Sequence, residues 1–426
     1  MKQINLTITA EAPLAIGQRK PGGSVSEAMD YIPGAAIRGA VAAKVLEQAG
    51  SEPGVSTESS GDDFHRLFLT DQAVVFQNAY PAIAKVGNDH YEESLEVRLL
   101  PVTALSSKTD SGFKPDKGGV FDSLIDGFCA REQGLFYEPN GLTGDSASAD
   151  LSVRVEPFSG FYSKKGNTYR SHTVSKRLLT RVGINRRRAT AQEEMLYSLE
   201  VLDEVQGKKH PQPMVYQSSI FVRDDDLADQ MHQFITHYSN QFRLGGAASR
   251  GLGKVEIKAS IDALQLHTHE IKQRIEHFNQ KIMERWHLWS AFGADTPLAK
   301  QIFFTVNLQS DAILNERWQR TMVVSEEMLR HFAGISNAAD PTLTLQIAYS
   351  SYDYRSGWNA AWGLQKDLEL VTKMSGVYLF GTQNPDLWYD KLAELTLWGV
   401  GDRTSEGFGQ IQICDEFHLI FRENAV

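Results

Sequence analysis

Two glycine-rich segments of one design stand far apart in this chain, and they constrain its architecture more than any other feature. The first reads LGGAASRGLGKVEI from Leu244, and the second reads VGDRTSEGFGQIQI from Val400. One glycine-rich turn before a strand is common, but two that align without gaps predict an internal duplication. The aligned pairs, at a constant offset of 156 residues (400 minus 244), include Gly245 with Gly401, Ser249 with Ser405, Gly251 with Gly407 and Gly253 with Gly409.

The length and composition are those of an ordinary globular protein with more than one domain. Its 426 residues suffice for two or three domains, each able to bury its own core. Hydrophobic residues make up 42% of the chain, the mean hydropathy is −0.32, and no apolar run has the length of a membrane span. The first residues lack the pattern of a signal peptide, so we expect a cytoplasmic protein.

Cysteine and histidine usage gives no support for a metal site. Cys129 and Cys414 are the only cysteines, which argues against a disulfide framework and a cysteine-based zinc site. His267 and His269 stand two residues apart, but such pairs at the start of a helix are more often surface residues than ligands. We therefore expect neither a metal nor another cofactor.

Positive charge is concentrated in one segment of an acidic chain. The formal net charge of −10 argues against a protein that coats nucleic acid without partners. Residues 157–192 nevertheless contain nine Lys and Arg and no Asp or Glu. A segment of this kind is typical of a groove for a polyanion, and a solvated surface loop is the alternative interpretation.

The hydrophobic pattern predicts an α+β fold in which each half ends with a helix, a glycine-rich loop and a strand. Alternating residues in QINLTITAEAPLAI and KQIFFTVNLQSDAIL predict the first strand of each half. Residues 85–160 are rich in turn residues and are expected to be mostly loop. We predict an N-terminal domain over 1–258 with an insertion at about 85–160, a helical connection over 259–299, and a C-terminal domain over 300–426.

Several motifs together carry a family resemblance. YIPGAAIRGAVAAKVL, GGAASRGLGKVEI and GDRTSEGFGQIQI, in this order, resemble the RAMP superfamily of CRISPR-associated proteins. Further segments, among them HTVSKRLLTRVGINRRRATAQEEMLYSLEVL and RSGWNAAWGLQKDL, are similar in type and order to the type III-D branch, the Csx-ten family. Some relatives carry cysteine pairs after VFDSL where this chain has only Cys129, so a zinc-stabilised insertion is not expected.

The resemblance implies a fold and a function. Members are built from ferredoxin-like, RRM-type units with antiparallel sheets, and we expect two such units here. The implied function is that of a Cas-five-like subunit of a type III CRISPR effector, which holds the 5′ handle of the CRISPR RNA in antiviral defence. The implied partners are that RNA, the large signature subunit and the backbone RAMP subunits, with target RNA as an indirect partner and no membrane.

Physical chemistry favours particular residues for this task. Glycines let the backbone N–H groups approach phosphates closely, and Arg or Lys adds charge there. The residues around Pro33 also suit the start and packing of a helix, which is an equally good interpretation of that motif. The predicted RNA-binding residues are Gly34, Arg38, Lys176, Arg177, Arg181, Arg186, Arg187, Arg188, Gly245, Gly246, Ser249, Arg250, Gly251, Gly253, Lys254, Arg403, Gly407 and Gly409.

Two other classes of function are weighed against RNA binding. A metal-free endoribonuclease that processes CRISPR RNA precursors needs a general base and acid, and His172 is the one weak catalytic candidate. Target cleavage would need a loop aspartate, for which Asp110, Asp116 and Asp122 are available. A pure protein adaptor is the other class, for which the acidic body and the aromatic loop after Asp353 are suited. The aromatic residues of this region have two interpretations, a surface on which bases stack and a core or subunit interface. They are Tyr352, Tyr354, Trp358 and Trp362.

Overall fold

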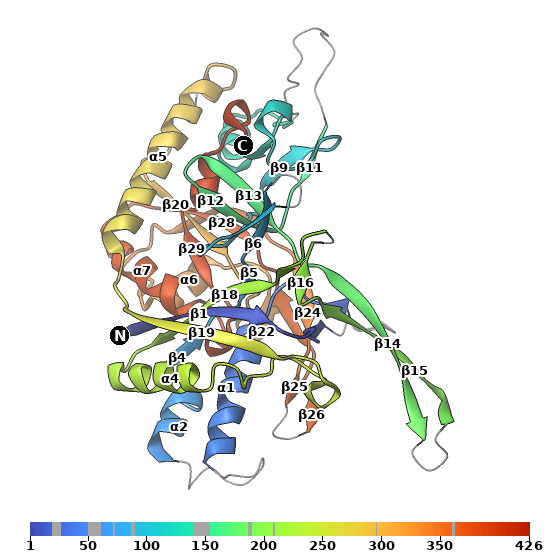
Figure 1. The fold of residues 1–426 in the computed structure, drawn as a ribbon. Coiled ribbons are helices and arrows are strands. Elements are labelled where there is room, and N and C mark those ends of the chain that lie inside the picture. Colours follow the sequence, from blue (N-terminus) through green and yellow to red (C-terminus); the bar gives the residue numbers. More distant parts are fainter. Residues whose placement is uncertain are drawn as a thin grey trace.

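The computed structural model describes ten stretches of the chain, and in them two antiparallel sheets define two units (Figure 1). No helix in these stretches is long and apolar enough to cross a membrane. The described residues are 1–18, 27–49, 61–70, 73–86, 90–139, 154–185, 190–207, 209–294, 296–359 and 363–426.

The first unit is a sheet covered by helices on one face. Its strands are β1 (Lys2–Ala10), β4 (Val74–Phe76), β18 (Val215–Val222) and β19 (Val255–Ala263), in the spatial order β19-β1-β18-β4. Alternate residues of β1, namely Ile4, Leu6 and Ile8, are fully buried with the apolar side chains of the helices, as the sequence pattern predicts. The helices are α1 (Gly34–Gln48), α2 (Gly61–Phe68) and α4 (Asp225–His237).

The second unit repeats this arrangement. Its strands are β20 (Ile302–Leu308), β23 (Thr344–Tyr349), β28 (Val377–Thr382) and β29 (Ile411–Ile413), in the order β23-β28-β20-β29, with helices α6 (Glu326–Ala333) and α7 (Tyr389–Trp398). The first sheet has a fifth strand, β5 (Tyr80–Pro81), which pairs with β18 beside β4. When the other four strands of the first sheet and the four of the second are numbered along the chain, both have the spatial order 4-1-3-2. The strand order therefore agrees with the duplication that the two glycine loops predict.

The segment 85–160 holds short strands and one helix between its turn-rich stretches. It holds the strands β9 (Ala104–Ser107), β10 (Val120–Asp122) and β11 (Val155–Pro157) and the helix α3 (Leu124–Glu132). The helix forms because Leu124, Phe128 and Cys129 are buried against the second unit. A helix of nine residues has too few turns to give a clear periodic signal before this packing is known.

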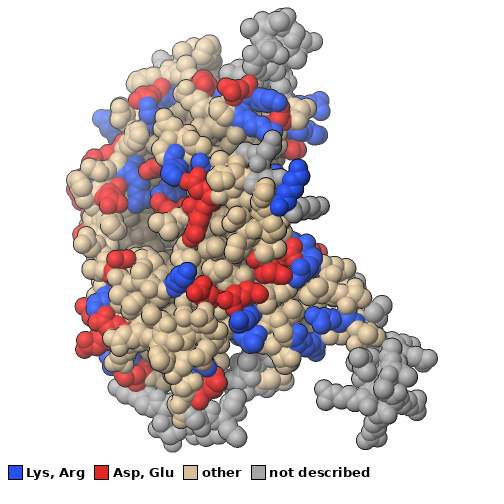
Figure 2. All heavy atoms as spheres, viewed as in Figure 1, with Lys and Arg blue, Asp and Glu red and all other residues tan. Residues whose placement is uncertain are grey.

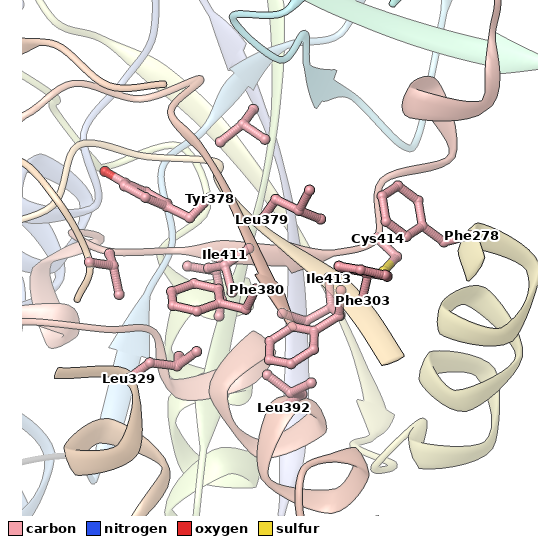
Figure 3. Close-up of a cluster of buried hydrophobic side chains, with 14 of the residues drawn as sticks. Phe278, Phe303, Leu329, Tyr378, Leu379, Phe380, Leu392, Ile411, Ile413 and Cys414 are labelled. Carbon is pink, nitrogen blue, oxygen red and sulfur yellow. The ribbon is translucent and has the colours of Figure 1, made fainter. Parts of the chain in front are cut away.

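The largest core lies between the second sheet and the helices that cover it (Figure 3). The long helix α5 (Thr268–Ser290) connects the two units, and it buries the apolar stripe Ile271, Ile275, Phe278 and Ile282 that its sequence predicts. Phe303, Phe380 and Ile413 from the sheet fill the same core, and Cys414 is a buried free thiol there.

A long two-stranded hairpin extends from the body of the protein (Figure 1). It consists of β14 (Lys176–Asn185) and β15 (Thr190–Leu202), which pair antiparallel. The remaining strands are β2 (Gly17–Gln18), β3 (Glu27–Ala28), β6 (Ile83–Val86), β7 (His90–Glu93), β8 (Arg98–Leu99), β12 (Phe161–Lys165), β13 (Thr168–His172), β16 (Val205–Gln206), β17 (Gln212–Pro213), β21 (Leu314–Glu316), β22 (Gln319–Thr321), β24 (Tyr352–Arg355), β25 (Trp358–Asn359), β26 (Leu364–Gln365) and β27 (Glu369–Thr372).

Candidate nucleic-acid interface

The two glycine-rich loops have the same backbone conformation. Each contains one turn of 3₁₀ helix, Ala248–Arg250 in the first loop and Thr404–Glu406 in the second. Each also forms a β-bridge to the segment that follows the first strand of its own unit. The left-handed φ angles agree at equivalent positions: +86° at Gly245 and +83° at Gly401, +57° at both Ala247 and Arg403, +84° at Gly251 and +91° at Gly407, and +83° at Gly253 and +66° at Gly409.

The surroundings of the second loop make it a joint between the two units. A Cβ atom on Gly407 would lie 2.7 Å from Asn78 Oδ1 and 2.9 Å from the carbonyl oxygen of Phe76. Gly34 meets the same carbonyl from the start of α1, and its N–H donates to Asn78 Oδ1 over 2.8 Å. The amide of Gly34 is therefore used inside the protein, which agrees with the interpretation of that motif as a helix start.

The charged side chains at this joint gather around one carboxylate, that of Glu406. Glu406 is largely buried, and its carboxylate lies 2.6 Å from Arg403, 3.1 Å from Lys366 and 4.0 Å from Arg38. Burial alone would raise the pKa of Glu406, but the neighbouring cations, Arg403 foremost, hold this pKa below its usual value. Arg38 also donates to the carbonyl of Phe68. Two of the predicted RNA-binding cations, Arg38 and Arg403, are thus engaged at the joint.

The first loop is open where the second is covered. Ala248, Ser249 and Arg250 are exposed, and a Cβ on Gly251 would meet nothing within 4 Å among the described residues. Arg250 stands at the position that Glu406 occupies in the second loop, 156 residues further on (406 minus 250). The same backbone therefore carries a largely buried acid in one unit and an exposed base in the other.

The first loop and the β14–β15 hairpin form one continuous surface. Ala247 and Leu252 of the loop belong to an apolar cluster with Leu179, Leu199 and Val201 of the hairpin. Beside this cluster, the guanidinium of the loop arginine donates to a hairpin tyrosine. The bond runs from Arg250 to the hydroxyl of Tyr197 over 2.5 Å, and the guanidinium lies 5.5 Å from the centre of that ring.

Tyr197 in turn stands opposite Arg181 across the hairpin. Sequence reasoning did not single out Tyr197, although its alternation with apolar neighbours in β15 places it on one face of the strand. The strand pattern could therefore have identified Tyr197 as a surface residue. Its contact with Arg250 could not be predicted in this way, because Arg250 lies 53 residues further along the chain.

Much of the positive charge in residues 157–192 is balanced by acids from other segments. Figure 2 shows acidic side chains interspersed with basic ones over the body of the protein. Of the nine cations, Arg181 is exposed and pairs with no carboxylate of a described residue, and Arg186, Arg187 and Arg188 lie outside the described residues. The other five form ion pairs: Lys164 with Glu416, Lys165 and Arg170 with Glu92, Lys176 with Asp30, and Arg177 with Asp203 and Glu204.

The remaining predicted residues of the first loop have structural contacts as well as exposure. Lys254 is exposed and pairs with Glu11 over 2.7 Å. The N–H of Gly246 donates to Ala15, and a Cβ on Gly245 would lie 2.6 Å from the same carbonyl oxygen. Gly253 and its counterpart Gly409 are similarly close to backbone carbonyls of their own loops, so both glycines are needed for the turn itself.

Comparison with protein families identifies the chain. A model of the RAMP superfamily matches residues 7–256, from the first strand to the strand that follows the first glycine loop. The chain belongs to the RAMP superfamily. No protein with a curated description matches it.

Among solved structures, this RAMP protein is similar to chains of three cryo-EM structures of the type III-B Cmr-beta complex. A chain of the complex bound to cognate target RNA and AMPPnP is 13% identical, with a TM-score of 0.37 over 88% of this protein and 86% of that chain. A chain of the complex bound to cognate target RNA is 12% identical, with a TM-score of 0.37 over 96% of this protein and 96% of that chain. A chain of the apo complex is 11% identical, with a TM-score of 0.30 over 60% of this protein and 96% of that chain.

His172 of this RAMP protein is placed as a core residue. It is only 2% exposed, and its Nε2 atom lies 2.8 Å from the hydroxyl of Ser163. Burial lowers the pKa of His172 to about 4, with a smaller contribution from the charge of Arg170. The ring is therefore neutral at pH 7, inaccessible to an RNA hydroxyl, and a weak base.

We expect His172→Ala to leave any processing of CRISPR RNA precursor unchanged while it lowers the thermal stability of the protein. The loss of stability follows from the cavity that the substitution leaves and from the lost hydrogen bond to Ser163. The measurement is incubation of the purified subunit with a repeat-containing precursor, beside a thermal unfolding scan. Cleavage by the wild-type subunit that disappears in the variant would restore the processing hypothesis.

The loop aspartates and the aromatic residues of the alternative functions lie in different surroundings. Asp122 is buried between Thr103, whose hydroxyl donates over 2.6 Å, and His418 at 3.1 Å. Asp110 is held by Lys114 and Lys117 at 2.6 and 3.0 Å, and Asp116 is exposed. Tyr352 and Tyr354 are exposed with their ring centres 6.0 Å apart. Trp362 and the side chain of Trp358 lie outside the described part of the chain.

Proposed function

We propose that this RAMP protein is an RNA-binding subunit of a type III CRISPR effector complex in antiviral defence. In this proposal the first glycine loop and the β14–β15 hairpin hold the 5′ handle of the CRISPR RNA. The carrying observation is the contrast between the two loops: the first exposes Arg250 beside Tyr197 of the hairpin, whereas the second buries Glu406 at a joint. A shared backbone with opposite charge and opposite exposure supports different roles for the two loops.

The chemistry of the first loop suits an RNA backbone. The open glycine turn leaves room for a phosphate, and the exposed side chains of Arg250 and Arg181 supply charge beside it. The N–H groups of Gly246, Arg250, Gly251 and Gly253 donate to carbonyl groups of the protein, so the phosphate contacts in this proposal come from the arginine side chains. Tyr197 is 39% exposed between these arginines and offers a ring on which an unpaired base can stack. Four of the predicted residues form the joint between the units in this proposal, and Gly409 serves the turn of its own loop. The four are Gly34, Arg38, Arg403 and Gly407.

The proposed ferredoxin-like units and the proposed branch of the superfamily rest on sheet topology and on the order of the sequence motifs. The 4-1-3-2 strand order in both sheets supports two ferredoxin-like units. The order of the sequence motifs supports the type III-D, Csx-ten branch, with the large signature subunit and the backbone RAMP subunits as partners. The buried position of His172 supports a non-catalytic subunit.

The test is RNA retention by the complex purified with its native partners. We expect Arg181→Gln with Arg250→Gln, and charge reversal at Arg186, Arg187 and Arg188, to reduce bound CRISPR RNA and its uniform repeat-derived 5′ ends. Each lost phosphate contact should also flatten the dependence of log K on log salt by roughly one unit. A matched control is Arg317→Gln, because Arg317 is an exposed arginine on the β21–β22 turn.

Two results would contradict the proposal. Complexes with the hairpin variants that keep wild-type RNA, 5′ ends and salt dependence would favour a pure protein adaptor. Absence of RNA from every preparation of the wild-type complex would remove the RNA-binding function altogether.

A further inference from the structure

A polar groove of about 820 Å³ lies between the two units, away from the hairpin residues discussed above. One wall is the face of the first sheet that no described helix covers, which presents Gln3, Asn5 and Thr7 of β1. The other wall comes from β29 and the segment before it, with the beginning of α5 at one end. Figure 2 shows a hollow between the two halves of the molecule on this face. Its volume is in the range of ligand sites, roughly 300–1,000 Å³.

The first wall is a preorganised polar surface. Gln3 donates to Asn5 Oδ1 over 2.6 Å and to the hydroxyl of Ser219 over 3.1 Å. Thr7 donates to Gln217 over 3.1 Å on the neighbouring strand. These bonds fix the side chains in place, so a ligand that binds here meets groups whose rotamers are already ordered.

The opposite wall carries amide groups that lack a protein partner. Gln410 is 8% exposed, and its Nε2 donor has no hydrogen-bond partner among the described residues. Gln412 of β29 also lines this wall, and Gln77, which follows β4, lines the wall of the first sheet; no hydrogen bond joins either side chain to a described residue. A buried donor without a partner is costly in a folded protein, so it indicates a ligand or ordered water at that position.

The charge of the groove is balanced, which decides the kind of group it fits. The number of its cations equals the number of its carboxylates. The cations are Arg98, Lys258 and Arg274, and the carboxylates are Glu96, Glu270 and Glu416. A wall without net positive charge does not suit the phosphate backbone.

A protein partner is also a poor fit. Within the described part of the chain, the only ring of Phe, Tyr or Trp that lines the groove is that of Tyr80, which is itself buried. Protein interfaces, by contrast, centre on exposed aromatic anchors. Side-chain amides offer a donor and an acceptor in one plane, as the edges of nucleobases require.

We propose that this groove binds the base edges of an unpaired RNA segment, with Gln77, Gln410 and Gln412 as the residues that read them. The proposal rests on the RNA-binding function proposed above and adds a second, sequence-reading site to the charge-dependent one. Affinity at the hairpin then comes mainly from phosphates, and preference among bases comes from the groove.

The test combines crosslinking with salt dependence in the complex purified with its native partners. RNA that carries 4-thiouridine in its handle should crosslink to peptides that contain Gln77 and Gln412, as well as to the hairpin. We expect Gln77→Ala with Gln412→Ala to reduce affinity for the native handle about tenfold relative to a handle of scrambled sequence. The salt dependence should not change, because no phosphate contact is lost. Gln319→Ala, at an exposed glutamine of β22, is the matched control.

The outcomes separate this inference from the function on which it rests. Crosslinks to the hairpin with none in the groove, and an unaltered preference in the double variant, would overturn the groove as an RNA site and leave the hairpin proposal standing. No RNA crosslink anywhere in the protein would overturn both.

Discussion

Gly407→Ala is expected to destabilise this RAMP protein far more than Gly251→Ala, although the two glycines occupy equivalent places in the two loops. Their φ angles are +91° and +84°, so a Cβ suffers the same left-handed strain at both, about 1–2 kcal/mol. The difference lies in what the new methyl group meets. At Gly251 it meets no atom of a described residue within 4 Å, whereas at Gly407 it lies within 3 Å of Asn78 and of the Phe76 carbonyl.

The steric clash at Gly407 cannot be relieved by a small movement of the neighbouring atoms. The Phe76 carbonyl belongs to β4, whose three residues are all buried, and Asn78 is held by the N–H of Gly34. Overpacking against such atoms costs roughly 1–3 kcal/mol, which gives a total of about 2–5 kcal/mol at Gly407.

Urea unfolding of the two variants and the wild type measures the difference directly. Equal losses of stability would mean that the second loop is not a joint between the units.

Asp340→Asn is the second substitution for which we expect a large effect. The carboxylate of Asp340 is fully buried and accepts hydrogen bonds from Thr382, Trp388 and Asn384 at 2.6, 2.7 and 3.0 Å, and from Thr342. An amide in its place turns an NH₂ group toward donors and leaves at least one buried group unpaired. Hydrogen bonds to a charged acceptor contribute about 1.5–3 kcal/mol each, so we expect a loss of roughly 3 kcal/mol at pH 7.

The pH dependence identifies the cause of that loss. Burial alone would raise the pKa of Asp340, but the donors, Thr342 first among them, hold this pKa far below its usual value. A carboxyl group with a lowered folded-state pKa contributes stability above its unfolded pKa, about 3.9, and loses it as the pH falls toward the folded value. The stability gap between wild type and Asp340→Asn should therefore narrow below about pH 4.

Urea midpoints between pH 3 and pH 7 provide the measurement. Asp386→Asn is the control, because Asp386 lies in an exposed turn just before α7. A gap that stays constant over this range would show that the charge of Asp340 contributes nothing to the loss.

Local patterns made the elements of this fold predictable. The alternation in β1, the apolar stripe of α5 and the two glycine loops depend on neighbours within a few turns or one strand. What the sequence could not reveal is which loop is covered. That depends on contacts between Gly34 and Glu406, which lie at opposite ends of the chain and whose proximity has no local signal.

The charge pattern is instructive for the same reason. Residues 157–192 contain no acid, yet Glu92 alone engages both Lys165 and Arg170, and Glu416 engages Lys164. A run of like charges along a chain is a positive surface only where the fold brings no carboxylates to it. In the described residues of the proposed site this condition holds for Arg181 and Arg250, so the site is narrower than the sequence suggests. The polar groove was missed because its walls come from both units.

The position of α3 has a consequence for folding during translation. This helix is made early in synthesis, but Leu124, Phe128 and Cys129 bury themselves in a core completed by β20 and by Ile413 near the other end. During translation these side chains lack their final packing partners until almost the whole chain has been made. α3 therefore reaches its final packing only after the second half of the chain is made, whereas the core of the first sheet is built within residues 4–261.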